Sequence, residues 1–194
     1  MAIVRWSWLG DPLAIDLVNT VRRVGWQYTE LIRSPDDVRG WLDREHGRLT
    51  APAEVDDDLV TRFLALRDHA LDLLRAAASG QPWPAEAVAA VNALIVAAPS
   101  TRLLTGKPGG YRTQPVTAPG PAGRLLGDLA AAVVDLLTGP DAPGLTLCDA
   151  PGCGHLYLRH RPNQQWCNPA CGTRARTDRH NAQPAGRPAG RHHG

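Results

Sequence analysis

All four cysteines of the chain lie close together near its C-terminal end. Cys148 and Cys153 form one pair, and Cys167 and Cys171 form a second pair after thirteen intervening residues. Each pair can supply two thiolates from one turn of the chain, which is how tetrahedral zinc sites are assembled. A glycine follows the second cysteine of each pair, where it allows a tight turn and an N–H bond to a charged thiolate. The spacing predicts one zinc ion, and four thiolates leave no open position, so the ion should be structural.

Two disulfides, an iron centre or a redox-active thiol pair are the alternatives to zinc for the same four cysteines. Disulfides form in oxidising compartments, and the first residues of the chain lack the basic region and apolar core of a secretory signal. We therefore expect a cytoplasmic protein that holds zinc on its thiolates.

The composition is that of a globular chain with an uneven distribution of charge. Of the 194 residues 43% are hydrophobic, and no apolar run reaches the length of a membrane span, so no membrane partner is expected. Residues 148–194 hold seven arginines against two acidic residues, whereas residues 1–147 carry a net negative charge. The basic character around the cysteines favours an anionic partner such as nucleic acid, and a composition bias is the alternative explanation for the arginines.

Apolar residues spaced three and four apart predict several amphipathic helices before the cysteines. We expect these helices over residues 35–46, 53–79, 88–95 and 126–138. Ser34 should cap the first of them. The apolar run 13–20 fits either a helix or a strand, and the stretches 101–104 and 111–116 predict a β-hairpin.

The cysteine region predicts a small hairpin followed by a helix. Residues 156–158 should pair with 165–166, and Asn168 should cap a helix that runs to about His180. Cys171 would then lie in the first turn, where the positive end of the helix favours a thiolate. The predicted fold is mainly α with a small β-hairpin (α+β): a helical N-terminal domain over residues 1–144, a zinc-ribbon or treble-clef-like module over 145–183, and a disordered basic tail over 184–194.

Two motifs resemble the CGNR zinc-finger family, whose members join an N-terminal ABATE domain to a cysteine module. The segment Ile15–Thr20 is similar to the family's opening Leu-Asp-Phe-Val-Asn-Thr signature. Trp166–Cys167 and Cys171–Arg174 stand where the family has Trp-Cys and Cys-Gly-Asn-Arg, although Thr173 replaces the asparagine and Gln164–Gln165 replace arginines. The resemblance covers nearly the whole chain and implies a bacterial, stress-induced transcription regulator.

A regulator of this kind would contact DNA through the cysteine module. Arg176 and His180 lie four residues apart and share one face of the expected last helix, while Arg174 can also pair with Asp178. The candidate DNA-binding residues are Arg159, Arg161, Arg174, Arg176, Arg179 and His180. A solvated basic face without a role in nucleic-acid binding is the alternative.

The N-terminal domain would then hold a small-molecule effector. Asp16, Asn19 and Thr20 are the candidate polar groups, Arg22 or Arg23 is a candidate anchor for an anion, and Trp26 is a candidate aromatic wall. The alternative interpretation is that Asp16 and Asn19 cap or cross-link the fold.

Two other classes of function compete with the regulator. One is a zinc-stabilised protein-interaction or homodimerisation module that does not bind DNA. The other is an enzyme, which we do not expect, because the sequence lacks His-Glu-x-x-His, Gly-x-Ser-x-Gly and Gly-x-Gly-x-x-Gly motifs and leaves no cysteine over as a nucleophile. We also expect the two parts to fold independently, so that Cys167→Ser releases the metal and leaves the helical domain folded.

Overall fold

The structure is a computed structural model that describes residues 11–24, 27–106, 108 and 110–182. Trp26, a candidate effector contact, lies outside the described residues. The tail 184–194, which the sequence predicts to be disordered, lies outside them as well. Among the described helices, none is both long enough and apolar enough to cross a membrane.

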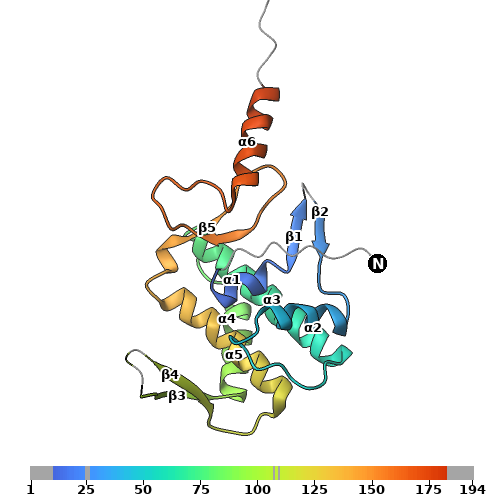
Figure 1. The fold of residues 1–194 in the computed structure, drawn as a ribbon, viewed down its shortest axis with the longest axis vertical. Helices are drawn as coiled ribbons and strands as arrows, with labels where there is room; N and C mark the ends of the chain where they lie inside the picture. Colours follow the sequence, from blue (N-terminus) through green and yellow to red (C-terminus); the bar gives the residue numbers. More distant parts are fainter. Residues whose placement is uncertain (1–10, 25–26, 107, 109, 183–194) are drawn as a thin grey trace, which may run out of the picture.

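Helices make up most of the described chain, as the sequence predicts (Figure 1). The helices are α1 (Leu13–Val18), α2 (Pro35–Arg44), α3 (Asp57–Ala78), α4 (Ala85–Ala97), α5 (Gly120–Thr138), the short 3-10 helix η1 (Ala142–Gly144) and α6 (Pro169–Ala182). The strands form three separate antiparallel hairpins: β1 (Val21–Val24) with β2 (Gln27–Glu30), β3 (Ser100–Leu104) with β4 (Tyr111–Pro115), and β5 (Leu145–Leu147) with β6 (Leu156–Leu158).

Side-chain caps determine where two of the helices begin. Ser34 Oγ accepts a hydrogen bond from the N–H of Asp37 at 3.3 Å, so α2 starts at Pro35 as expected. Asp56 Oδ1 accepts a hydrogen bond from the N–H of Leu59 at 2.8 Å. Because this cap fixes the start of α3 at Asp57, the helix begins four residues later than the apolar spacing predicts.

The strands differ more from the predictions than the helices do. The apolar run 13–20 forms α1, and the predicted hairpin over 101–116 is confirmed as β3–β4. The β1–β2 hairpin was not predicted. The pairing of 156–158 with 165–166 was wrong: β6 pairs with β5 instead, because these two strands flank the first cysteine pair and are closed by it.

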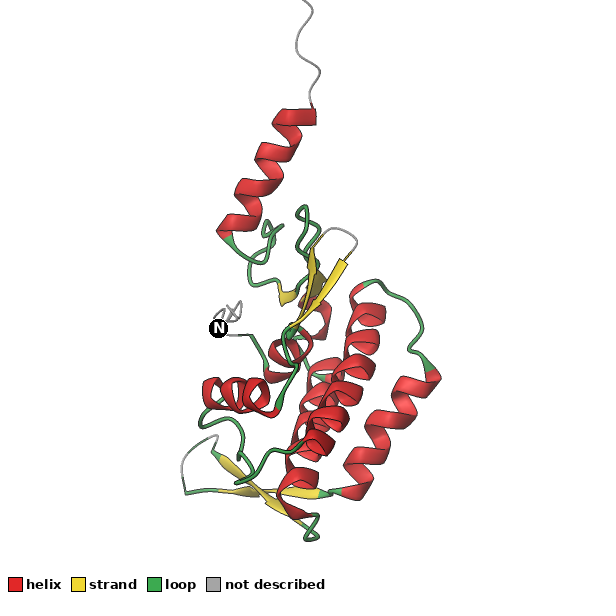
Figure 2. Cartoon of the chain, turned by 90° about the vertical axis from the view of Figure 1, so that its right-hand side faces the viewer, coloured by secondary structure: helices red, strands yellow, loops and turns green. Residues whose placement is uncertain are grey.

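The main hydrophobic core lies between α3, α5 and the shorter helices that pack around them (Figure 2). Phe63 of α3 is fully buried and meets Trp41 of α2 edge to face, with ring centroids 5.2 Å apart. Leu125 and Leu129 of α5 are equally buried in the same core. This face of α3 and α5 therefore holds the helical part together.

The cysteine region is attached to this core through its hairpin. Leu145 of β5 and Leu156 and Leu158 of β6 are buried in the main core, whereas Tyr157 packs beside the cysteines. The α6 helix then projects away from the body, at the opposite end of the molecule from the β3–β4 hairpin (Figures 1 and 2).

Candidate metal centre

The four cysteine sulfurs converge on one point between the β5–β6 hairpin and the start of α6. All four sulfurs lie within 4.8 Å of one another, and none of the cysteines is in a disulfide. Three of the Sγ–Sγ distances, Cys167–Cys171, Cys171–Cys153 and Cys153–Cys167, are 3.4, 3.5 and 3.6 Å. A tetrahedral zinc ion with bonds of about 2.3 Å places its sulfurs about 3.8 Å apart. The cluster therefore has the donor set and nearly the spacing of a four-thiolate metal site.

The first cysteine pair lies in the turn of the β5–β6 hairpin. The N–H of Cys148 donates to the carbonyl of His155 at 2.8 Å, and the N–H of Gly154 donates to the carbonyl of Cys148 at 3.1 Å. Gly152 and Gly154 have φ of 70° and 68°, a backbone conformation that other residues adopt at a cost. These two glycines let the chain reverse direction and present Cys148 and Cys153 to the same point.

The second pair is held by the first turn of α6. Asn168 caps the helix by accepting a hydrogen bond from the N–H of Cys171 at 3.0 Å, as the sequence predicts. The side-chain amide of Asn168 also donates to Cys167 Sγ at 3.3 Å. The N-cap therefore positions both cysteines at the start of the helix.

Gly172 has a role different from the one expected of it. The expectation that the glycines after Cys153 and Cys171 donate their N–H groups to thiolates was wrong, because Gly154 and Gly172 donate to main-chain carbonyls. A Cβ at Gly172 would lie 2.9 Å from Cδ1 of Trp166. Glycine is needed here so that the indole can pack against α6 beside the cysteines.

Hydrogen bonds among the cysteines change their pKa values in opposite directions. Hydrogen bonds from Cys153 and Cys167 lower the pKa of the Cys148 thiol. The same interaction with Cys148 raises the pKa of Cys153 to about 12, and interactions with both neighbours raise that of Cys167. The Cys148 thiolate therefore forms readily, whereas ionising Cys153 and Cys167 beside it requires a cation that offsets the repulsion between thiolates.

Arg174 contacts the cysteine cluster directly. Its Nη2 donates to Cys171 Sγ at 3.0 Å, a charge-assisted hydrogen bond to a group that is anionic when it ligates a metal. The expected ion pair between Arg174 and Asp178 is not among the contacts of the described residues. The arginine of the Cys-Gly-Thr-Arg motif thus supports the cysteine ligands, a role that the sequence analysis did not identify.

The remaining candidate DNA-binding residues are exposed on α6 and on the loop after β6. Arg176 Nη2 donates to Thr173 Oγ1 at 3.2 Å, and Arg179 Nε donates to the carbonyl of Ala175 at 3.2 Å. His180 is exposed on the same helix, and Arg159 and Arg161 are exposed after β6. Their charged groups are therefore open to solvent.

Asp16 and Thr20, two of the candidate effector residues, make contacts inside the protein. Asp16 Oδ2 accepts a hydrogen bond from Arg48 Nη1 at 2.8 Å, and Glu45 Oε2 accepts one from the same nitrogen at 2.8 Å. Thr20 is fully buried and donates to the carbonyl of Leu17 at 2.7 Å. Arg22 lies in β1, where it is paired with Thr29 of β2.

Asn19 joins the helical part to the cysteine module. Its Nδ2 donates to the carbonyl of Leu156 at 2.8 Å, and its Oδ1 accepts from the N–H of Leu156 at 3.1 Å. Asp11 Oδ1 accepts from the N–H of Leu158 at 3.4 Å. These contacts, together with the Arg48 ion pairs, cross-link the fold. Arg48 and Asp11 lie outside regular elements, so no sequence periodicity marks them.

Two protein-family models match successive parts of the chain. Residues 11–140 match the model of the ABATE family, which is described as "putative stress-induced transcription regulator". Residues 145–183 match the model of the CGNR zinc finger. No curated protein matches the chain. The chain belongs to the ABATE family and carries a CGNR zinc finger at its C-terminal end.

Proposed function

We propose that this protein is a transcription regulator that holds one structural zinc ion and contacts DNA through α6, while its helical part senses a small ligand. The observation that carries the DNA-binding proposal is the position of α6. The helix is anchored at the thiolate cluster by its first turn and then extends away from the body (Figure 1). The ABATE match supports the regulatory role.

Zinc is the metal that best fits the cysteine cluster. Four thiolates at tetrahedral spacing suit Zn²⁺ or an iron centre, and the CGNR match favours zinc. Cys148, Cys153, Cys167 and Cys171 would be its ligands. A metal surrounded by four cysteines has no position for substrate, so its role would be to fix the start of α6 relative to the hairpin.

The surface of α6 suits a polyanion better than an apolar partner. Among its residues with described burial, only Cys171, Gly172 and Ala175 are buried, so the rest of the helix is exposed. The helix carries three arginines and one aspartate. An α-helix fits the major groove of DNA, and arginine can pair with phosphates or with guanine edges. A protein-docking helix would instead show an apolar stripe.

A zinc-stabilised interaction or dimerisation module remains the competing function, and a catalytic role is not part of the proposal. Both alternatives predict a zinc-loaded protein that does not bind DNA. The first experiment must therefore separate loss of zinc from loss of DNA contact.

The test is retention of the zinc-loaded protein on genomic DNA fragments across a salt series, with zinc content measured alongside. Arg176→Gln should weaken retention and reduce the salt slope by about one, because one phosphate or base contact is lost, while zinc stays at one per chain. Arg174→Gln should in addition weaken zinc binding by about tenfold or more, since it removes a hydrogen bond to a ligand.

Arg112→Gln is the matched control, because it removes the same charge from β4 at the opposite end of the molecule. Its retention should equal that of the wild type. A zinc-loaded wild-type protein that fails to bind DNA even at low salt would refute the DNA-binding proposal and favour the interaction module.

A further inference from the structure

A polar cavity of about 440 Å³ lies in the helical part of the molecule, outside the zinc finger. It is formed by the loop after α2, the β3–β4 hairpin and one side of α5. Arg48, Arg102 and Arg124 come from these three elements and line the same cavity. Asp16, Asn19 and Thr20, the effector candidates whose side chains are described, do not line it. This cavity is therefore a separate candidate for the ligand site.

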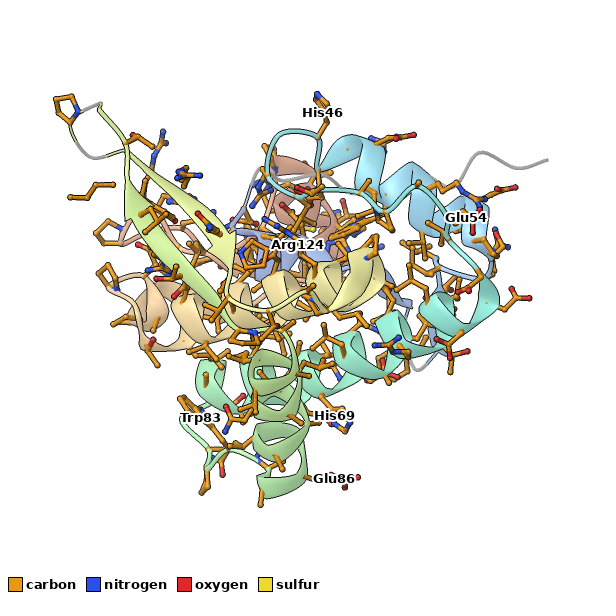
Figure 3. The ribbon with its side chains drawn as sticks, turned by 90° about the horizontal axis from the view of Figure 1, so that it is seen from below. His46, Glu54, His69, Trp83, Glu86 and Arg124 are labelled. Carbon is orange, nitrogen blue, oxygen red and sulfur yellow. The ribbon has the colours of Figure 1, made fainter. Side chains whose placement is uncertain are left out.

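Arg124 lines this cavity and carries an N–H group that is not hydrogen-bonded to any described residue. Its Nε is buried and has no hydrogen-bond partner among the described residues. Asp128 Oδ2 lies 3.6 Å from this nitrogen and forms an ion pair with it, but the distance is too long for a hydrogen bond. Figure 3 shows Arg124 on α5, between the β3–β4 hairpin and the loop that carries His46. A buried donor without an acceptor is costly unless a ligand or water supplies one.

The charges around the cavity suit a single negative charge. Three arginines face two acidic residues, Asp128 and Asp135, along the lining. Asp135 is already paired with Arg102, and the guanidinium of Arg102 stacks on the ring of Tyr111 at 5.3 Å. Counted over the lining alone, the arginines exceed the acids by one, but Arg48 is also bonded to Asp16 and Glu45 from outside the lining. A ligand with one negative charge therefore suits the cavity better than a phosphate dianion.

A second hollow of about 510 Å³ adjoins the first and is lined mainly by apolar groups. The two hollows share Thr50 and Arg124. Half of the residues that line the second hollow are proline or alanine, including Pro115, Ala118 and Pro119. A molecule with its charged end on Arg124 could place an apolar body here, which is the usual division of polar and apolar contacts in ligand sites.

We infer that this double cavity binds a small organic monocarboxylate, with the carboxylate on Arg124 and an apolar group against Pro115 and Pro119. The inference rests on the proposal that the helical part senses a small ligand, and it gives that ligand a chemical class. It does not depend on DNA binding by α6.

The test is an NMR titration of the full-length, zinc-loaded, ¹⁵N-labelled protein with benzoate, followed at the Nε–Hε signal of Arg124. Benzoate should shift this signal saturably, and the neutral isostere benzamide should not. Arg124→Gln should weaken benzoate binding by about tenfold or more, because a charged hydrogen bond is lost. Arg112→Gln is the control. Arg112 follows Tyr111 on the same strand, but it does not line the cavity, so the affinity for benzoate should be unchanged.

Three results would overturn the inference: no shift with tens of millimolar benzoate, equal binding of benzamide, or tighter binding of inorganic phosphate than of benzoate. The amide spectrum of Arg124→Gln shows whether that variant is folded. Arg124→Lys gives a second variant that keeps the charge and should retain part of the affinity. DNA retention is measured separately, so benzoate binding without DNA binding would support this inference and refute the proposal for α6.

Discussion

The Nη1 atom of Arg48 lies 2.8 Å from a carboxylate oxygen of Asp16 and 2.8 Å from one of Glu45. The side chain of Glu45 is fully buried, and its Oε1 has no hydrogen-bond partner among the described residues. Burial outweighs the attraction of Arg48 and raises the pKa of Glu45 to about 7 and that of Asp16 to about 6. These two carboxyl groups therefore titrate near neutral pH.

Glu45→Gln should change how stability depends on pH. The folded protein holds the Glu45 proton up to about pH 7, whereas an unfolded glutamate loses it near 4.5. Folded chains thus bind more protons in this window, and the wild type should lose stability as pH rises through it. Relative to Glu45→Gln, the free energy of unfolding of the wild type should fall by about 2 kcal/mol between pH 5 and pH 8.

Urea unfolding at several pH values measures this difference. Glu54→Gln is the matched control, because Glu54 is exposed on the loop before α3, and its curve should run parallel to that of the wild type (Figure 3). Parallel curves for the wild type and Glu45→Gln would contradict the expectation, because they would show that folding does not change the pKa of Glu45.

The positions of some site residues can be predicted because they follow from residue type and spacing. The four cysteines and the Asn168 cap belong to this class. Arg174 was expected to pair along its own helix, yet it reaches back to Cys171, since a nearby thiolate is a stronger attraction than an exposed aspartate. Arg48 was not identified, because its partners are brought together only by tertiary packing.

At the scale of elements, the three-residue strand β6 is supported on two sides. One edge pairs with β5, and the other is bonded by the side chains of Asn19 and Asp11 in place of a third strand. The helices were predictable because their apolar spacing and caps are local. The β5–β6 pairing was not, because strands of three residues carry no periodicity of their own.

Asn19→Ala should destabilise the protein by about 2 kcal/mol, because it leaves the N–H and carbonyl of Leu156 without their partners. Amide hydrogen exchange at Leu156 should become faster at the same time. Asn92→Ala, at an exposed position of α4, is the control and should leave both quantities unchanged. Unchanged exchange at Leu156 in Asn19→Ala would show that these bonds do not protect β6.

The main hydrophobic core of the described residues crosses the boundary between the two family matches. Leu145, Leu156 and Leu158 of the zinc-finger segment are buried with the residues of α3 and α5. The sequence predicts that the two parts fold independently, but local sequence patterns do not report which residues share a core.

Removing the metal should therefore destabilise the helical part. Cys167→Ser, or chelation of zinc, should release β5 and β6 and expose the apolar face that Leu156 and Leu158 cover. The thermal midpoint of the helical circular-dichroism signal should fall by about 4 °C or more, as expected for a loss above about 1 kcal/mol. Thr138→Ser, a conservative change at the end of α5, is the control. An unchanged midpoint after complete zinc removal would restore the independent-folding model.

The side chain of Arg48 lines the cavity and is also connected to β6 through Asp11. Its Nη2 donates to the carbonyl of Asp11 at 3.0 Å, and Asp11 in turn accepts from the N–H of Leu158. A ligand that draws the Arg48 side chain toward the cavity would therefore affect β6, the strand that follows Cys148 and Cys153. Linkage makes such an effect reciprocal: a ligand that alters zinc affinity by some factor has its own affinity altered equally by zinc. The amount of available zinc would then change the affinity of the cavity for its ligand, although zinc binds outside the cavity.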